Sequence, residues 1–309
     1  MTTSVEIRHR TMESALRGKE PGASPPPPEY RPGDCELADF AGLGHTPSSS
    51  SSESLPQYES VAKPEASTSC AAGFEATLAF QVDSLGHPCL ALPFPPRPDP
   101  IPVYSVLPTG ELGPLAYQSL RETRRSGDCV LLRAGDAGDG PVSSTAYRFG
   151  PNRPPKISLL GDVACDETLE VRGTGCHTRA QDIRTPFGAF QWRYASRAER
   201  KAVGASSLLV LNRITTVAVA GGKHEESRRP VARLVRNEAL RTEGTGSSTA
   251  GNGGRLLMDL RAWTDTKRES RQMEVFVIAS CIAMLKKEVD RRRLHQFIII
   301  AGAASGGGP

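Results

Sequence analysis

The chain has few of the residues that build large hydrophobic cores. Of its 309 residues, 38% are hydrophobic and 6% are aromatic, while 30 are glycine and 25 are proline. Globular domains are typically about 45–50% apolar. A composition this polar excludes a bundle of membrane-spanning helices and argues against a chain that is folded from end to end.

Cysteine pairs and a secretory leader are missing as well. The seven cysteines include no pair at CxxC spacing, so the sequence has no zinc-ribbon or redox motif. The first residues include Glu6, Arg8 and Arg10 with no apolar run behind them, unlike a secretory signal. We therefore expect a cytoplasmic protein with free thiols, either unattached or peripheral at membranes, and no transmembrane span.

Familiar catalytic signatures are incomplete. His224-Glu225 is followed by Arg228 where a zinc protease needs its second histidine, and no GxSxG nucleophile motif occurs. Gly222-Lys223 lacks the first glycine of a phosphate-binding loop, and Cys176-His177 has no cluster of further ligands. We therefore expect a protein that is not an enzyme and that holds no metal or cofactor.

Charge is divided unevenly along the chain. Residues 1–75 contain 6 Lys or Arg against 11 Asp or Glu, a net charge of −5, whereas residues 76–309 contain 32 against 23, a net charge of +9. The first segment is rich in Pro and Ser and has too little apolar area to offset its ordering entropy, which predicts a disordered tail. The basic remainder indicates an anionic partner, with a solvated arginine-rich surface as the alternative.

Short apolar or alternating runs follow the tail, and turn residues separate them. This pattern is typical of antiparallel sheet rather than of alternating strands and helices. Nine prolines in residues 88–114 predict a linker or a long loop, and Gly221–Arg229 and Thr242–Gly254 predict mobile loops. The predicted strands are Phe74–Val82, Cys129–Arg133, Thr145–Phe149, Lys156–Leu160, Glu167–Val171, Phe187–Tyr194, Ser207–Ile214, Thr216–Ala220, Pro230–Val235 and Gly254–Trp263.

One segment, Met273–Leu285, is apolar on nearly every face, with only Glu274 and Ser280 as exceptions. As a helix it would span about 20 Å, less than the roughly 30 Å hydrocarbon core of a bilayer. A helix that is apolar all round and too short to span should be buried inside protein. We predict a central helix near residues 271–290, a C-terminal tail over residues 294–309, and core positions at Val275, Ile278, Ile282 and Leu285.

Antiparallel sheet around a helix buried on every face resembles the tubby C-terminal-like superfamily, which includes the LURP-one-related proteins and the phospholipid scramblases. The chain is similar to fungal members of that superfamily, whose function is mostly unassigned. The resemblance implies an antiparallel β-barrel over residues 76–293 that encloses the C-terminal hydrophobic helix. The residues that carry it are Thr185–Tyr194, Arg197–Arg200, Ser207–Arg213 and the segment from Val275 to Lys287.

Four basic residues lie in or just after this motif: Arg193, Arg197, Arg200 and Lys201. If a strand ends at Tyr194, these four should cluster near the barrel rim, and guanidinium groups suit phosphate oxygens. Basic barrel residues of tubby proteins bind phosphoinositide headgroups, so the resemblance implies an anionic phospholipid site at these four. The alternative is a solvated turn in which Glu199 pairs with Arg197 or Arg200. Without a recognition helix or stacking aromatics, we expect no sequence-specific nucleic-acid binding.

The tail contains two short proline–tyrosine motifs. Proline pre-forms the polyproline II helix and a tyrosine fills an adjacent pocket, as in ligands of WW domains such as those of Nedd4-type ubiquitin ligases. Chance occurrence in a Pro-rich tail is the alternative. The motif residues are Pro27, Pro28 and Tyr30 of PPxY, and Leu55, Pro56 and Tyr58 of LPxY.

These features predict a mainly β protein, an antiparallel barrel around a helix, that acts as a non-catalytic adaptor. It would bind an anionic phospholipid surface and recruit a WW-domain partner. The alternatives are a scramblase-like lipid-handling protein and a structural family member with no ligand.

Overall fold

The computed structural model describes residues 73–135, 140–148, 153–174, 178–219 and 223–305. The first 72 residues of the predicted tail, with both proline–tyrosine motifs, lie outside these ranges, and so does Cys176-His177.

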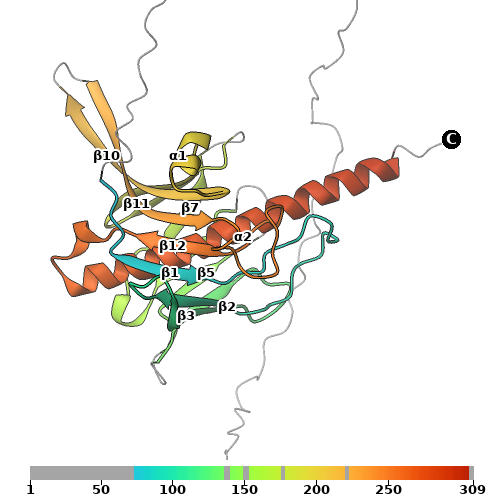
Figure 1. The fold of residues 1–309 in the computed structure, drawn as a ribbon, viewed down its shortest axis with the longest axis horizontal. Helices are drawn as coiled ribbons and strands as arrows, with labels where there is room; N and C mark the ends of the chain where they lie inside the picture. The colour runs from blue at the N-terminus through green and yellow to red at the C-terminus, as the bar shows by residue number, and fades with distance from the viewer. Residues whose placement is uncertain (1–72, 136–139, 149–152, 175–177, 220–222, 306–309) are drawn as a thin grey trace, which may run out of the picture. The chain divides into compact units, whose positions relative to one another are not determined.

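Twelve strands form a closed antiparallel β-barrel (Figure 1). Strands that are consecutive in sequence pair with each other, and β1 (Leu78–Val82) pairs with both β2 (Ile101–Val106) and β12 (Gly254–Met258), which closes the sheet. The mainly β fold class is therefore confirmed. The other strands are β3 (Leu112–Leu120), β4 (Cys129–Arg133), β5 (Ser143–Ala146), β6 (Lys156–Leu159), β7 (Leu169–Gly173), β8 (Gln181–Thr185), β9 (Gly188–Tyr194), β10 (Ser207–Val219) and β11 (Lys223–Arg236).

Buried and exposed side chains alternate along the strands because successive side chains point to opposite faces of the sheet. In β7, Leu169 and Val171 are fully buried, whereas Arg172 is exposed. In β7, apolar side chains therefore face the lumen and polar ones face outward.

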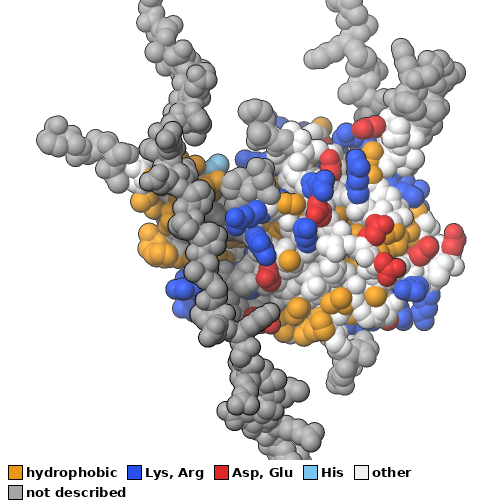
Figure 2. All heavy atoms as spheres, turned by 180° about the vertical axis from the view of Figure 1, so that it is seen from behind, with side chains coloured by type: hydrophobic (Ala, Val, Ile, Leu, Met, Phe, Trp, Pro, Cys, Tyr) orange, Lys and Arg blue, Asp and Glu red, His pale blue; other side chains and the backbone are white. Residues whose placement is uncertain are grey.

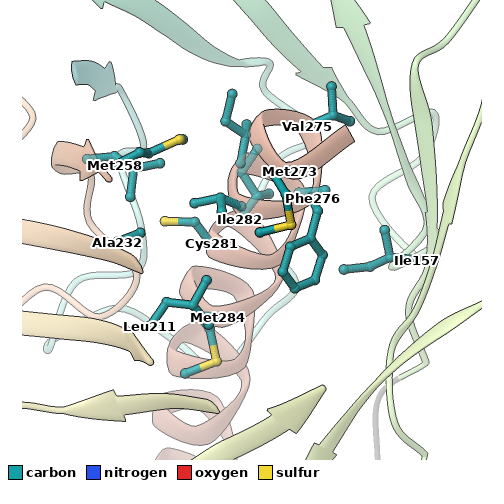
Figure 3. Close-up of a cluster of buried hydrophobic side chains, with 14 of the residues drawn as sticks. Ile157, Leu211, Ala232, Met258, Met273, Val275, Phe276, Cys281, Ile282 and Met284 are labelled. Carbon is teal, nitrogen blue, oxygen red and sulfur yellow. The ribbon is translucent and has the colours of Figure 1, made fainter. Parts of the chain in front are cut away.

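The helix α2 (Lys267–Ser305) fills the lumen. Its residues Val275, Ile278, Ile282 and Leu285 are all buried, as the sequence predicts. In Figure 3, Phe276 points toward Ile157 of β6, while Cys281 points to the opposite side. The apolar residues of α2 therefore contact strands on several sides at once.

The two polar residues of this apolar segment each have a partner on the barrel wall. The Tyr117 hydroxyl of β3 donates to the Glu274 carboxylate (2.8 Å), and the Trp192 indole of β9 donates to the Ser280 hydroxyl (3.0 Å). Buried polar groups cost free energy unless they are hydrogen-bonded. These two bonds therefore allow polar side chains inside the lumen and anchor the helix at one register.

The helix is longer than the sequence analysis predicts. It begins before residue 271 and continues through the predicted tail as far as Ser305, and residues 306–309 lie outside the described ranges. No proline or glycine interrupts residues 286–301, so nothing local ends the helix where it leaves the barrel.

Two predicted loops are wrong in part. The proline-rich stretch 88–114 contains β2 and the start of β3. The sheet tolerates Pro102 because this residue lies next to a register irregularity, and its carbonyl still accepts a hydrogen bond from the Asp83 amide (2.9 Å). Gly221–Arg229 mostly belongs to β11, which pairs with β10 as a long hairpin that projects from the barrel in Figure 1.

Candidate functional site

A pocket of about 480 Å³ opens where α2 leaves the barrel, and we call it the exit pocket. Its walls come from the segment between β1 and β2, the segment between β3 and β4, the end of β5 and the outgoing turns of α2. These segments are distant in sequence, and the closure of the barrel brings them together.

The exit pocket combines an apolar floor with a basic rim. Ile282, Leu285 and Val289 of α2 form the floor. Seven basic and four acidic side chains line the pocket, so its formal charge is +3. The acidic residues are Asp83, Asp99, Asp128 and Asp290, and the basic residues are Arg97, Arg121, Arg124, Arg125, Arg148, Lys286 and Arg293.

Three of these arginines hold the proline-rich segment against the rim. Arg121 donates to the carbonyls of Pro96 (2.7 Å) and Arg97, and Arg124 donates to the carbonyl of Pro95 (2.6 Å). Arg293 of α2 donates to the carbonyl of Pro93 (3.2 Å) and pairs with Asp290 (3.1 Å). The segment therefore has a defined position although it contains no helix or strand between residues 88 and 100.

Lys286 lies deepest among the basic residues. Burial lowers the pKa of its ammonium group to about 8, and nearby Cys129 opposes that shift. Its ammonium donates to the Gly127 carbonyl and lies 4.3 Å from the centre of the Tyr147 ring. A Cβ at Gly127 would come within 2.0 Å of the Tyr147 carbonyl oxygen, so only glycine fits there.

The four basic residues predicted from the sequence lie at or beside the short helix α1 (Arg197–Ala202), but their side chains are engaged differently. Arg193 lies one residue before the end of β9 and makes a two-pronged ion pair with Glu199 (2.9 and 2.5 Å), which lowers the pKa of that carboxyl to about 2. Arg200 donates to the Ser206 carbonyl (3.0 Å). Arg197 and Lys201 are exposed on α1.

A second basic hollow, of about 640 Å³, contains two of those four residues. Arg193 and Arg200 line it together with Arg179, which lies over the Tyr194 ring (5.7 Å from its centre). Arg197 and Lys201 are not among its lining residues. Glu199 pairs with Arg193 rather than with Arg197 or Arg200, because it also accepts from the Ser196 amide (2.8 Å) in a capping box at the start of α1.

Next to this hollow lies a buried charged cluster. Arg236 of β11 pairs with Glu288 of α2 (3.0 Å), and both are almost fully buried. Glu288 also accepts from the Tyr194 hydroxyl (2.5 Å) and the Gly251 amide (3.0 Å). Burial, with Glu288 adding to it, raises the pKa of the Tyr194 hydroxyl well above its usual range, so this tyrosine stays protonated. The cluster ties α2 to the wall of the barrel.

Comparisons with known proteins give no relative: no family model, no curated protein and no solved structure matches the chain. Within the described ranges, no three His, Cys, Asp or Glu side chains come together as metal ligands. A search of the same residues finds no helix with the length and apolar character needed to cross a membrane.

The exit pocket lies apart from the basic residues predicted as a lipid site. Its basic residues come from four separate segments, and two of these are visible in the sequence as local basic runs, Arg121–Arg125 and Lys286–Arg293. The first run directly follows β3 and the second directly follows the apolar part of α2, and together they are the signal that could have located the site.

Proposed function

We propose that the protein is a non-catalytic adaptor that binds an anionic phospholipid at the exit pocket. The observation that carries this proposal is the pairing of an apolar floor with a basic rim in one cavity. Arginine forks suit phosphate oxygens, and an apolar floor suits the glycerol and upper acyl carbons of the same molecule. A small inorganic anion would leave the floor unused.

The architecture gives separate support. A barrel around a C-terminal helix is what the resemblance to tubby-like proteins implies, and phosphoinositide binding is the property that the resemblance brings with it. The residues after β9 remain the alternative lipid site, since Arg197 and Lys201 are exposed and basic.

Vesicle sedimentation with two matched variants separates these sites. Arg125 and Arg148 are exposed on the rim of the exit pocket, and Arg197 and Lys201 are exposed on α1. Each double replacement by serine removes two positive charges. We expect R125S/R148S to weaken binding to vesicles that contain phosphoinositide roughly tenfold or more, and R197S/K201S to change it little.

The reverse order would move the lipid site to α1. Equal loss in both variants would indicate attraction to the overall positive charge rather than a pocket. No binding by the wild type would favour a structural protein without a ligand. Raising the salt concentration should weaken the wild-type interaction, because exposed charges are screened.

The adaptor half of the proposal rests on the tail sequence. We expect a peptide over residues 24–34 to bind an isolated WW domain with micromolar or weaker affinity, and a peptide over residues 52–61 to bind more weakly because Leu55 replaces the first proline. In the full chain, Tyr30→Ala and Tyr58→Ala should each reduce binding to a tandem WW protein, and the double change should abolish it. Titration with labelled protein measures this, and no binding at hundreds of micromolar would reduce both motifs to coincidence.

A further inference from the structure

The outer end of α2 is apolar on every side. Leu294, Phe297, Ile298, Ile299 and Ile300 are 48%, 47%, 61%, 70% and 51% exposed. Consecutive helical residues are about 100° apart around the axis, so the four residues from Phe297 to Ile300 point in all directions. A groove on a protein partner contacts one face of a helix, and it would leave the others in water.

A second apolar segment lies beside this helix end. Leu85, Leu90, Leu92 and Phe94, between β1 and β2, are 60%, 98%, 63% and 59% exposed. Three contacts hold the segment to α2. The side-chain amide of Gln296 donates to the Cys89 carbonyl (2.9 Å), and the Gln296 side-chain oxygen lies 3.1 Å from Nε2 of His87. Arg293 donates to the Pro93 carbonyl. We call these nine exposed residues the apolar tip.

The apolar tip contains most of the exposed large hydrophobic side chains. Of the twelve large hydrophobic side chains that are exposed in the described part of the chain, nine belong to it. In Figure 2, hydrophobic side chains gather at the left edge, where the outer end of α2 lies after the half-turn from Figure 1. Exposed apolar patches of this kind mark protein or membrane interaction sites.

Basic residues surround the base of the tip. Arg291, Arg292 and Arg293 precede it on α2, and Arg97 and Arg124 of the exit pocket lie at the segment that contains Phe94. An apolar end with a basic collar matches the layers of an anionic membrane surface, where phosphates lie above the acyl chains. The helix continues past Ile300 to Ser305, so end-on entry carries these residues with it. The nine residues from Phe297 to Ser305 rise about 13 Å, which fits within one leaflet of a hydrocarbon core about 30 Å thick.

We propose that the apolar tip inserts end-on into the boundary between headgroups and acyl chains of an anionic bilayer. The inference rests on the lipid binding proposed above and adds the part of the molecule that enters the membrane. End-on insertion brings the mouth of the exit pocket, whose lining includes Arg293, to the level of the phosphates.

Tryptophan fluorescence of the full chain tests insertion directly. The native Trp192 and Trp263 are buried, so a tryptophan introduced at Ile299 is the one exposed reporter within the described residues. With vesicles of phosphatidylcholine and phosphatidylserine, we expect I299W to show a blue shift and quenching by lipids brominated in the acyl chain. The matched control is L112W, at a residue that is 58% exposed and outside the tip, and it should show neither.

Affinity gives a second readout. The double variant I298S/I299S should bind these vesicles at least tenfold more weakly than the wild type and lose the part of the binding that resists high salt. The control L107S/L112S removes two exposed leucines elsewhere and should bind like the wild type.

The outcomes separate this inference from the proposed function. If R125S/R148S weakens binding while I299W is not quenched, the headgroup site stands and insertion is wrong. If I299W is quenched equally on pure phosphatidylcholine vesicles, insertion stands and the anionic headgroup site is wrong. If the wild type self-associates without lipid and I298S/I299S is monomeric, the tip is an interface between copies and the proposal is overturned.

Discussion

Replacing Ile278 with aspartate should unfold the barrel. Ile278 is fully buried in the middle of α2, where the lumen offers no room for water around a charge. An unpaired buried charge costs several kcal/mol, and domains are stabilised by only about 5–15 kcal/mol in total. We expect the cooperative thermal transition, followed by circular dichroism, to be lost or to shift down by tens of degrees.

The matched control is the same substitution on the same helix outside the barrel. Ile298 is 61% exposed, so Ile298→Asp should leave the melting temperature nearly unchanged. A wild-type transition in the Ile278→Asp variant would show that α2 does not fill the lumen. If both variants unfolded alike, the cause would be loss of helix propensity rather than burial of charge.

Glu288→Ala should be the next most damaging change. The substitution leaves Arg236, which is 4% exposed, as an unpaired buried cation and removes the acceptor of the Tyr194 hydroxyl. Breaking one partner of a buried ion pair typically costs about 3–5 kcal/mol. Urea denaturation should show a lower midpoint with an unchanged slope.

A double change distinguishes an unpaired charge from a loss of packing. Replacing both partners, as Arg236→Met with Glu288→Leu, should recover much of the lost stability, because it removes the desolvated cation along with its partner. Glu226→Ala, which breaks an exposed pair with Arg228, should have little effect. If the double variant were less stable than Glu288→Ala, the cluster would be stabilising beyond its charge balance.

Sequence patterns predicted the elements whose signal is local. Cys129–Arg133 is β4 with the predicted bounds, and the apolar run from Met273 to Leu285 is the lumen helix. The β8 strand was missed because its sequence, QDIRT, has one large apolar residue, and it is strand because both neighbours pair with it. Both β2 and β3 were missed because prolines lie in or just before them: Pro102 within β2, Pro108 before β3 and Pro114 within β3.

The candidate site was harder to predict for a related reason. Arg97, Arg148 and Lys286 are far apart in sequence and meet because the β1–β2 segment and the end of β5 lie at the rim where α2 leaves the closed sheet. Sequence spacing carries no information about that meeting. Conversely, the basic residues after β9 are adjacent in sequence, yet the ion pair of Arg193 with Glu199 and the hydrogen bond of Arg200 separate their roles.

A lumen filled by the last element of the barrel delays folding until late in synthesis. The strand β1 pairs with β12, and the core side chains of α2 follow both, about 200 residues after β1. At roughly 5–20 residues per second, a ribosome needs about 10–40 s to make that interval. Throughout it, the inner faces of the finished strands have no helix to cover them, and the sheet has an open edge at β1. The nascent barrel therefore exposes aggregation-prone surface for longer than a domain of this size whose contacts are local.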